Sequence, residues 1–226
     1  MDQILNSIVV QVHDDIYLKN PLSSTLGKKI INQSLMLIAE LGMEGFTFRK
    51  LADRIGSTEG AIYRYFENKH KLLLYHTAWY WGWLEHHLVF SISNLEDPHE
   101  KMKVAIRLLV EGPENKENQY LDPVLLTQVV TEESYKSFLT KEVDIENKNG
   151  YFKFFHRISK RLADIIHEIN PSYPYPKTLA STLMESTLLQ AFFLKHMPAM
   201  TELSVKGNEK VDFYHELVFK TLKDEN

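Results

Sequence analysis

Hydrophobic residues recur at spacings of three and four along nearly the whole chain after residue 25, which is the periodicity of amphipathic helices. Alternation with a period of two, which is typical of strands, occurs only at Ile8, Val10 and Val12. The pattern therefore predicts an all-α protein, with helices over about 24–42, 48–55, 59–66, 68–95, 99–111, 122–140, 149–169, 177–196 and 208–223.

Residues that cap helices stand at the ends of the first predicted helices. The candidate N-caps, whose side-chain oxygens accept hydrogen bonds from free backbone N–H groups, are Ser23 or Ser24, Thr47, Thr58 and Asn68. Gly42 and Gly56 stand at two helix ends, where a left-handed residue is common. The N-terminal region is therefore predicted to be a cluster of helices joined by tight turns.

The helices at 48–55 and 59–66 have the spacing of a helix-turn-helix. Ala52 is small where the two helices approach, Gly56 allows a positive φ in the turn, and Ile62 fills the angle between them. The opposite face of the second helix has few bulky groups near its N-terminus, which suits a DNA major groove about 12 Å wide. That face carries Glu59, Gly60, Tyr63 and Arg64.

Residues 25–75 resemble the DNA-binding domain of TetR-family transcriptional regulators. The resemblance lies in a threonine-capped helix, a glycine turn and the ending Tyr63-Arg64-Tyr65-Phe66-Glu67-Asn68-Lys69. Ser57 departs from the family pattern, where an apolar residue is usual, and so does acidic Glu59 on the face turned to DNA.

The resemblance implies a domain organisation and a function. It implies an N-terminal extension (1–23), a three-helix DNA-binding domain (24–71) and a larger helical domain for effector binding and dimerisation (72–226). A protein of this kind binds double-stranded DNA at a palindromic operator as a homodimer, acts as a repressor, and is released by a small hydrophobic or aromatic effector. No cofactor is implied.

Two groups of residues are predicted to contact DNA. Thr47, Tyr63 and Lys69 are expected to contact phosphates, which positions the protein without reading sequence. Lys28 is expected to add flanking positive charge, and the alternative for it is ordinary solvated surface. Bases are expected to meet Thr58, Glu59, Gly60, Ala61 and Arg64. For both Tyr63 and Tyr65, the alternative is that the ring packs in the three-helix core.

The last two predicted helices are apolar on more than one side, which is wider than one intramolecular core requires. A two-fold dimer would place two such pairs in a four-helix interface. Its predicted residues are Leu183, Leu188, Ala191, Phe192, Val211, Tyr214 and Val218. The alternative is that these residues are buried against their own chain.

Aromatic residues are dense in the helices at 68–95 and 149–169. They predict either an apolar effector pocket oriented by a few polar groups or an ordinary aromatic core. The pocket candidates are Tyr75, His76, Trp79, Trp83, His87, Gln128, Phe155 and His156.

Charge separates the DNA-binding range from the rest of the chain. Residues 24–71 carry a net charge of +3, residues 72–226 carry −5, and the whole 226-residue chain carries −4. Any DNA binding must therefore be local. The first 23 residues are acidic, which argues against a basic arm and favours a short packed strand or hairpin, with disorder as the alternative.

Composition excludes several other classes. The absence of cysteine removes disulfides, thiol nucleophiles and thiolate metal sites, and adjacent His86 and His87 point about 100° apart on a helix, so no metal is expected. No glycine-rich phosphate loop or nucleophile elbow argues for an enzyme. No apolar run is long enough for a membrane span, so the cytoplasm is expected. The rival hypothesis is a helical interaction module whose helix-turn-helix does not bind DNA.

Overall fold

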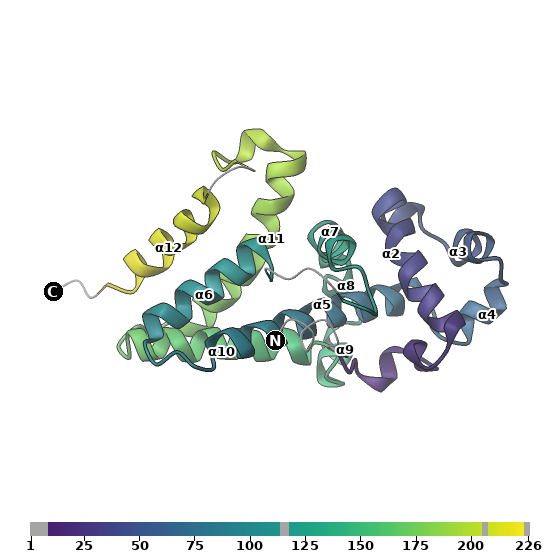
Figure 1. Ribbon diagram of the computed structural model, residues 1–226, viewed down its shortest axis with the longest axis horizontal. Helices are drawn as coiled ribbons and strands as arrows, with labels where there is room; N and C mark the ends of the chain where they lie inside the picture. The colour runs from purple at the N-terminus through teal and green to yellow at the C-terminus, as the bar shows by residue number, and fades with distance from the viewer. Residues whose placement is uncertain (1–8, 114–117, 205–207, 224–226) are drawn as a thin grey trace. The chain divides into compact units, whose positions relative to one another are not determined.

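The computed structural model describes residues 9–113, 118–204 and 208–223, and these residues form helices and no strand (Figure 1). The predicted all-α class is confirmed. The α-helices are α2 (Thr25–Gly45), α3 (Phe48–Ile55), α4 (Glu59–Tyr63), α5 (Lys69–Ile92), α6 (Pro98–Glu111), α7 (Pro123–Glu133), α8 (Tyr135–Phe138), α9 (Val143–Lys148), α10 (Lys153–Ile169), α11 (Pro176–His196) and α12 (Glu209–Thr221). Short 3₁₀ turns lie at Asp14–Ile16, Pro21–Ser23 and Pro198–Met200.

The chain forms two compact units. Unit 1 comprises Met1–Trp83 and Asn115–Lys153, and unit 2 comprises Leu84–Glu114 and Phe154–Asn226. The long helix α5 contributes residues to both. The functional ranges predicted from the sequence, 1–23, 24–71 and 72–226, stay a prediction.

The predicted caps hold the N-terminal helices of unit 1. The side-chain oxygens of Ser24, Thr47, Thr58 and Asn68 each accept a hydrogen bond from a backbone N–H group in the first turn of the following helix. Gly42 has the predicted positive φ of 66°, but it kinks α2 instead of ending it, and the helix continues to Gly45.

The turn between α3 and α4 has the predicted geometry. Gly56 ends α3 in the left-handed region with φ 65° and ψ 46°. The Ser57 N–H group then donates to the Ala52 carbonyl at 2.9 Å, which closes the turn. Ala52 and Ile62 are buried between the helices. Figure 1 shows α2, α3 and α4 gathered at one end of unit 1.

Residues 9–24, which we call the strap, are packed but do not form the strand or hairpin predicted from their alternation. Val10, Val12 and Ile16 are buried. The Val12 N–H group donates to the Val10 carbonyl at 3.1 Å, so the backbone turns on itself where a strand would stay extended and pair with a neighbour. The predictions at residues 1–8, including Ile8, lie outside the described residues.

The helix predicted over 122–140 is also wrong in detail, because the chain forms α7 and the single turn α8. Leu139 ends α8 with ψ 58°, outside the helical region. The helix predicted from residue 149 begins at Lys153 because Gly150 has a φ of 83°. Within unit 1, α7 packs beside α2, and the Met43 N–H group donates to the buried Glu133 carboxylate at 3.1 Å.

Unit 2 is a helical body in which α6 packs against both α11 and α12. Met102, Ala105 and Ile106 of α6 are fully buried. Asn170, which follows α10, donates from its side chain to the Leu222 carbonyl at the end of α12 at 3.2 Å. No helix among the described residues is long and apolar enough to cross a bilayer.

Candidate DNA-binding surface

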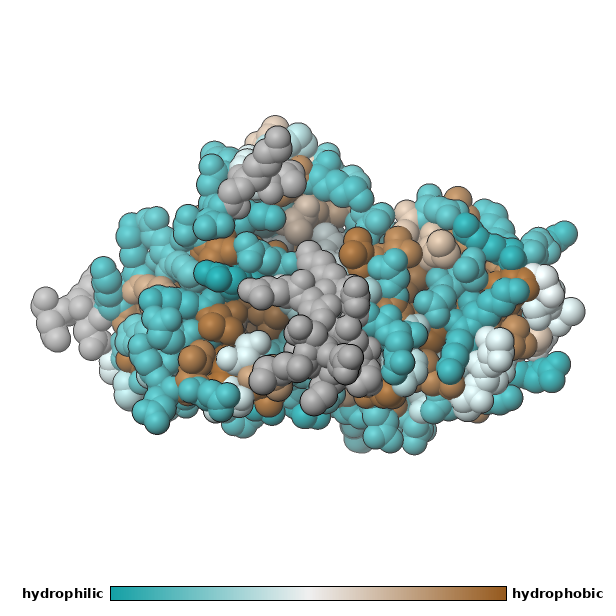
Figure 2. Space-filling model, in the orientation of Figure 1, coloured by the Kyte–Doolittle hydropathy of each residue, from teal (hydrophilic) through white to brown (hydrophobic). Residues whose placement is uncertain are grey.

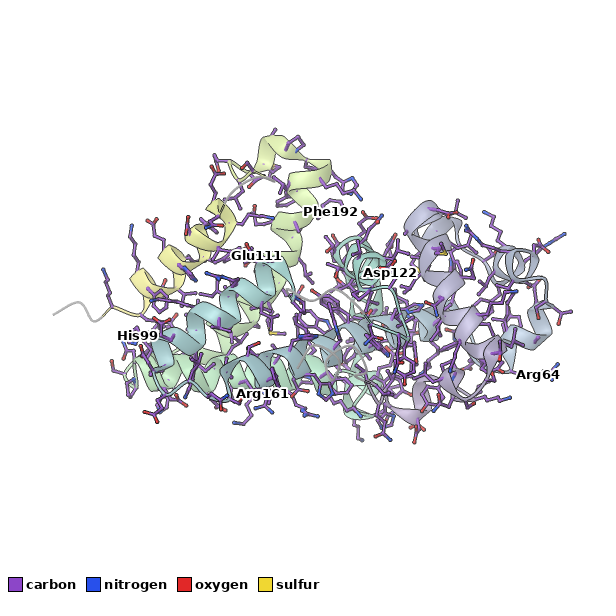
Figure 3. All side chains as sticks on the ribbon, viewed as in Figure 1. Arg64, His99, Glu111, Asp122, Arg161 and Phe192 are labelled. Carbon is purple, nitrogen blue, oxygen red and sulfur yellow. The ribbon has the colours of Figure 1, made fainter. Side chains whose placement is uncertain are left out.

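The outer face of α4 is a surface of unit 1, whereas its inner face is core. Ile62 is fully buried, and Ala61 is half-buried. Figure 3 shows Arg64 at the end of α4, pointing outward, and Figure 2 shows mainly hydrophilic and neutral residues at this end. The exposed residues of the segment are Thr58, Glu59, Gly60, Tyr63 and Arg64.

Two of the predicted phosphate and base contacts are also helix caps. The Thr47 Oγ1 accepts from the Lys50 N–H group at 3.2 Å, and the Thr58 Oγ1 accepts from the Ala61 N–H group at 3.2 Å. A hydroxyl that accepts at a cap keeps its own hydrogen for donation. Both threonines are exposed, so each can donate to an oxygen outside the chain.

Some cations near this face are already engaged by the chain. The Lys69 Nζ donates to the Met43 carbonyl at 2.7 Å, although Lys69 was predicted to meet phosphate. The Lys50 Nζ donates to the Gly45 carbonyl at 2.7 Å. Both bonds place a positive charge at the C-terminal end of α2, where it also interacts favourably with the helix dipole.

Three cations of the helix-turn-helix region have no ion pair or hydrogen bond from their side chains to the described residues. They are the predicted Lys28 and Arg64, together with Arg49. Arg49 was not among the predicted contacts. Phe48, Leu51, Ala52 and Ile55 are the buried side of α3, and that spacing places Arg49 on the outer side, beside the Thr47 cap.

The two tyrosines at the end of α4 differ in their surroundings. Tyr63 is 48% exposed, and its ring packs edge-on against Phe48 with centroids 5.0 Å apart. Tyr65 is buried, and its hydroxyl lies 2.7 Å from the Ser24 Oγ. That hydrogen bond lowers the pKa of Tyr65. The core alternative therefore holds for Tyr65 and not for Tyr63.

Gly60 has no structural reason to be glycine. Its φ is not positive, and a Cβ built on it would meet nothing within 4 Å. A glycine inside a helix destabilises it by about 1 kcal/mol relative to alanine. This part of the outer face therefore carries no side chain, at a cost in helix stability that no packing contact explains.

The residues predicted to line an effector pocket are divided between the two units. Tyr75, His76, Trp79, Trp83 and Gln128 belong to unit 1, and His87, Phe155 and His156 belong to unit 2. The five on α5 are buried, Gln128 and Phe155 are half-buried, and His156 is exposed. Burial of the α5 residues is what an ordinary core also predicts, so the pocket stays a prediction.

His76 and Trp79 lie one turn apart on α5 and are both fully buried. The His76 Nε2 lies 2.9 Å from the Ser34 Oγ, but its Nδ1 and the Trp79 Nε1 have no hydrogen-bond partner among the described residues. Burial lowers the pKa of His76 to about 3, so the ring is neutral. Buried side-chain nitrogens without a hydrogen-bond partner are unusual in proteins.

The residues predicted for a dimer interface are mostly in the core of unit 2. Ala191 and Phe192 are half-buried, and Phe192 lies on α11 (Figure 3). The buried ones are Leu183, Leu188, Val211, Tyr214 and Val218. The exposed hydrophobic residues within the same two helices are instead Leu189, Phe213 and Leu217. No group of three or more possible metal ligands occurs among the described residues.

Comparison with known proteins identifies the helix-turn-helix. Residues 30–75 match the family model described as bacterial regulatory proteins, tetR family. The tetracycline repressor protein class C of Escherichia coli is 46% identical over 44 residues, which are 20% of this chain. The matched segment spans 20% of that repressor's own length.

Two solved structures share the fold of nearly the whole chain. A bacterial regulatory protein in the tetR family from Rhodococcus RHA1 has a TM-score of 0.66 at 12% identity, over 90% of this chain and 100% of that one. AibR in complex with isovaleryl coenzyme A and operator DNA has a TM-score of 0.56 at 13% identity, over 85% and 98%. Residues 30–75 thus carry the helix-turn-helix of the tetR family model, and the longer chain shares the fold of these two solved structures.

Proposed function

We propose that this chain is a DNA-binding transcriptional regulator that acts as a repressor. The observation that carries the proposal is the outer face of α4, which is exposed, bears an uncommitted cation at Arg64, and is kept bare at Gly60. A small, uncluttered helix face is what close approach to base edges in a major groove requires.

In this proposal the helix caps and free cations position the protein on the duplex. The hydroxyls of Thr47 and Tyr63 donate to phosphate oxygens, and Lys28 and Arg49 supply positive charge. Lys69 reaches a phosphate only by sharing or exchanging its bond to the Met43 carbonyl. The fixed donors orient α4 without reading sequence.

Sequence would be read by the residues of α4 and its N-cap. Arg64 can donate to guanine, Glu59 can accept from the amino group of cytosine, and Ala61 can touch a thymine methyl group. Thr58 and Gly60 lie at the N-terminal end of the same face. We therefore expect a short recognition site for each chain.

We also propose that the protein works as a homodimer, because one short helix with few cations binds DNA weakly. A two-fold pair presents two α4 helices about 34–36 Å apart, in successive major grooves of a palindromic operator. The exposed Leu189, Phe213 and Leu217 on α11 and α12 support this, since their apolar surface is available to a second copy.

A small hydrophobic or aromatic effector would release the protein from DNA. The aromatic residues of α5 and the unpaired nitrogens of His76 and Trp79 support an effector that adds hydrogen bonds to an apolar contact. The effector must bind the DNA-free conformation more tightly, because equal affinity for two conformations shifts nothing. The structure of AibR with isovaleryl coenzyme A is a case in which a protein of this fold holds a small molecule.

The test is selection of bound sequences from random duplexes by the full chain, followed by measurement of affinity against salt. We expect a palindromic site, with affinity that falls steeply as salt rises because phosphate contacts release counterions. Arg64→Ala should change the preferred bases, whereas Tyr63→Phe should weaken all sequences alike. Absence of binding, or binding indifferent to salt, would favour the rival hypothesis of a protein-interaction module.

A further inference from the structure

A cavity of about 320 Å³ lies within unit 1, between the strap and the helix α5. Of the predicted effector-pocket residues it shares Tyr75, whereas Trp79 and Trp83 do not line it, and neither does any residue assigned to DNA. Its walls are Val9, Val10, Gln11, Val12, Tyr17, Asn20 and Leu22 of the strap and Tyr75 of α5.

The strap that lines this cavity is held at several points and is a built part of the fold. Pro21 packs so closely on α2 that a Cβ at Gly27 would lie 2.2 Å from the Pro21 carbonyl oxygen. The Leu18 N–H group donates to the Tyr65 carbonyl at 2.8 Å. Lys19 places its Nζ 5.2 Å from the centre of the Tyr65 ring. The strap therefore gives the cavity, which is open to solvent beside the exposed Val9, Gln11 and Asn20, an anchored wall.

Tyr75 is the polar group that marks the cavity as a binding site. The residue is only 2% exposed, and its ring packs against Tyr17 and Phe66 with centroids 6.2 Å and 5.5 Å away. Its hydroxyl makes no hydrogen bond to the described residues. The Tyr75 oxygen is not among the fully buried polar atoms that lack a partner, so the hydroxyl opens onto the cavity and can donate to a molecule bound there.

The remaining wall residues define the chemistry of that partner. Among the described residues, no Lys, Arg, Asp or Glu side chain lines the cavity, so a charged molecule would lose hydration without gaining an ion pair from them. The Asn20 Oδ1 already accepts from the Leu22 N–H group, and the Tyr17 hydroxyl donates to Asp14. The donors left open are the Tyr75 hydroxyl and the side-chain NH2 groups of Gln11 and Asn20, beside the Gln11 Oε1 as an acceptor.

We propose that the strap cavity binds a small neutral molecule that carries a hydrogen-bond acceptor, such as a carbonyl or ether oxygen, which accepts from the Tyr75 hydroxyl. The valine and leucine side chains of the strap cover the apolar part of the molecule. Burial raises the pKa of Tyr75, so the hydroxyl keeps its proton and acts as a donor at neutral pH. The site goes beyond the proposed DNA binding and does not depend on it.

An occupied cavity would also stabilise the strap at the point where it meets the end of α4. Tyr17 lines the cavity, and the N–H group of the next residue, Leu18, donates a hydrogen bond to the Tyr65 carbonyl just after α4. Binding therefore favours the described conformation of the strap over any in which it is released.

The test is ligand-observed ¹⁹F NMR with the full chain and three neutral probes, 4′-fluoroacetophenone, 4-fluorobenzamide and 4-fluoroanisole, beside the anion 4-fluorobenzoate. We expect at least one neutral probe to bind and 4-fluorobenzoate to bind at least tenfold more weakly. Tyr75→Phe should lower the affinity for that probe about fivefold, which corresponds to one lost hydrogen bond. Leu22→Trp, which fills the cavity from its half-buried edge, should abolish binding.

Tyr173→Phe is the matched control, because Tyr173 belongs to unit 2 and does not line the cavity. This variant should bind the probe with the affinity of the wild type. Circular dichroism of Tyr75→Phe and Leu22→Trp that matches the wild type would show that their loss of binding is not a loss of fold. The proposal is overturned if no neutral probe binds, which would mean that the cavity holds only water. It is equally overturned if Tyr75→Phe and Leu22→Trp both bind the probe as the wild type does. None of these measurements uses DNA, so they can fail while the regulator proposal stands.

Discussion

The helices α4 and α5 are adjacent in the chain and opposite in character. Within α4, Glu59–Tyr63, only Ile62 is buried. Within α5, every residue from Leu72 to Glu85 is buried. A helix with so little buried surface adds little to folding and is free to meet another molecule, whereas a helix buried on all sides is committed to stability. Substitutions should separate these two roles.

The largest effect is expected at the centre of α5. Trp79 is fully buried, and Trp79→Ala should lower the free energy of unfolding by about 3–5 kcal/mol through lost burial and a residual cavity. Arg64→Ala, on the exposed end of α4, should change it by no more than about 0.5 kcal/mol. Urea unfolding followed by circular dichroism measures both. Equal losses would remove the contrast between the two helices.

The next effect is a pH dependence that arises from α5. Burial lowers the pKa of His76 from its ordinary value of 6.5 to about 3, so below pH 6.5 the unfolded chain takes up a proton that the folded chain refuses. The contribution of His76 is therefore complete above pH 6.5 and is lost between pH 6.5 and 3, by at most about 1.4 kcal/mol per pH unit. Burial also lowers the pKa of His87, to about 4, which acts in the same direction.

The measurement compares wild type with His76→Gln by urea unfolding at pH 7, 6 and 5. Glutamine can still hydrogen-bond to Ser34 but does not titrate, so the other ionisable groups cancel in the difference. The stability advantage of the wild type at pH 7 should shrink as the pH falls. A difference that stays constant from pH 7 to 5 would show that His76 is not held neutral by burial.

The same contrast explains what the sequence could predict. Short-range signals were sufficient for α3 and for the start of α4, because a threonine cap, a left-handed glycine and a buried Ile62 each act within a few residues. The end of α4 was predicted too late, since the helix stops at Tyr63 and not at residue 66. The end of α8 at Leu139 and the start of α10 only after Gly150 depend on two backbone conformations that no cap or periodicity in the sequence indicated. The packing of α7 beside α2 through Glu133 joins residues 90 positions apart, which no local pattern encodes.

Site residues divide in a similar way. The bare outer face of α4 follows from helical spacing, and Arg49 could have been found by the same spacing on α3. The engagement of Lys69 by the Met43 carbonyl could not, because it depends on where α2 ends in space. The aromatic residues of α5 made Tyr75 a pocket candidate, but they could not tell that the opposite wall of its cavity is the strap.

A smaller effect is expected at the N-caps, where the two helices should respond alike. Thr58→Ala removes the acceptor of the Ala61 N–H group, and Asn68→Ala removes that of the Lys71 N–H group at the start of α5. Each should lower the free energy of unfolding by about 1 kcal/mol. Thr58→Ser keeps the acceptor and should recover most of the loss. A neutral Thr58→Ala would show that α4 does not need its cap.

The smallest effect on stability is also the sharpest test of α4, because stability and DNA binding should change in opposite directions. Gly60→Ala should raise the free energy of unfolding by about 0.5–1 kcal/mol, since the new methyl group meets no atom and alanine favours the helix. Gly56→Ala is the matched control. Its surroundings are equally open, but its φ of 65° penalises any side chain, so Gly56→Ala should destabilise the fold by about 1 kcal/mol.

On the selected operator, Gly60→Ala should bind more weakly than wild type although it is more stable, because its methyl group stands where the face approaches the bases. A stabilised Gly60→Ala with full operator affinity would mean that DNA does not approach α4 at this position.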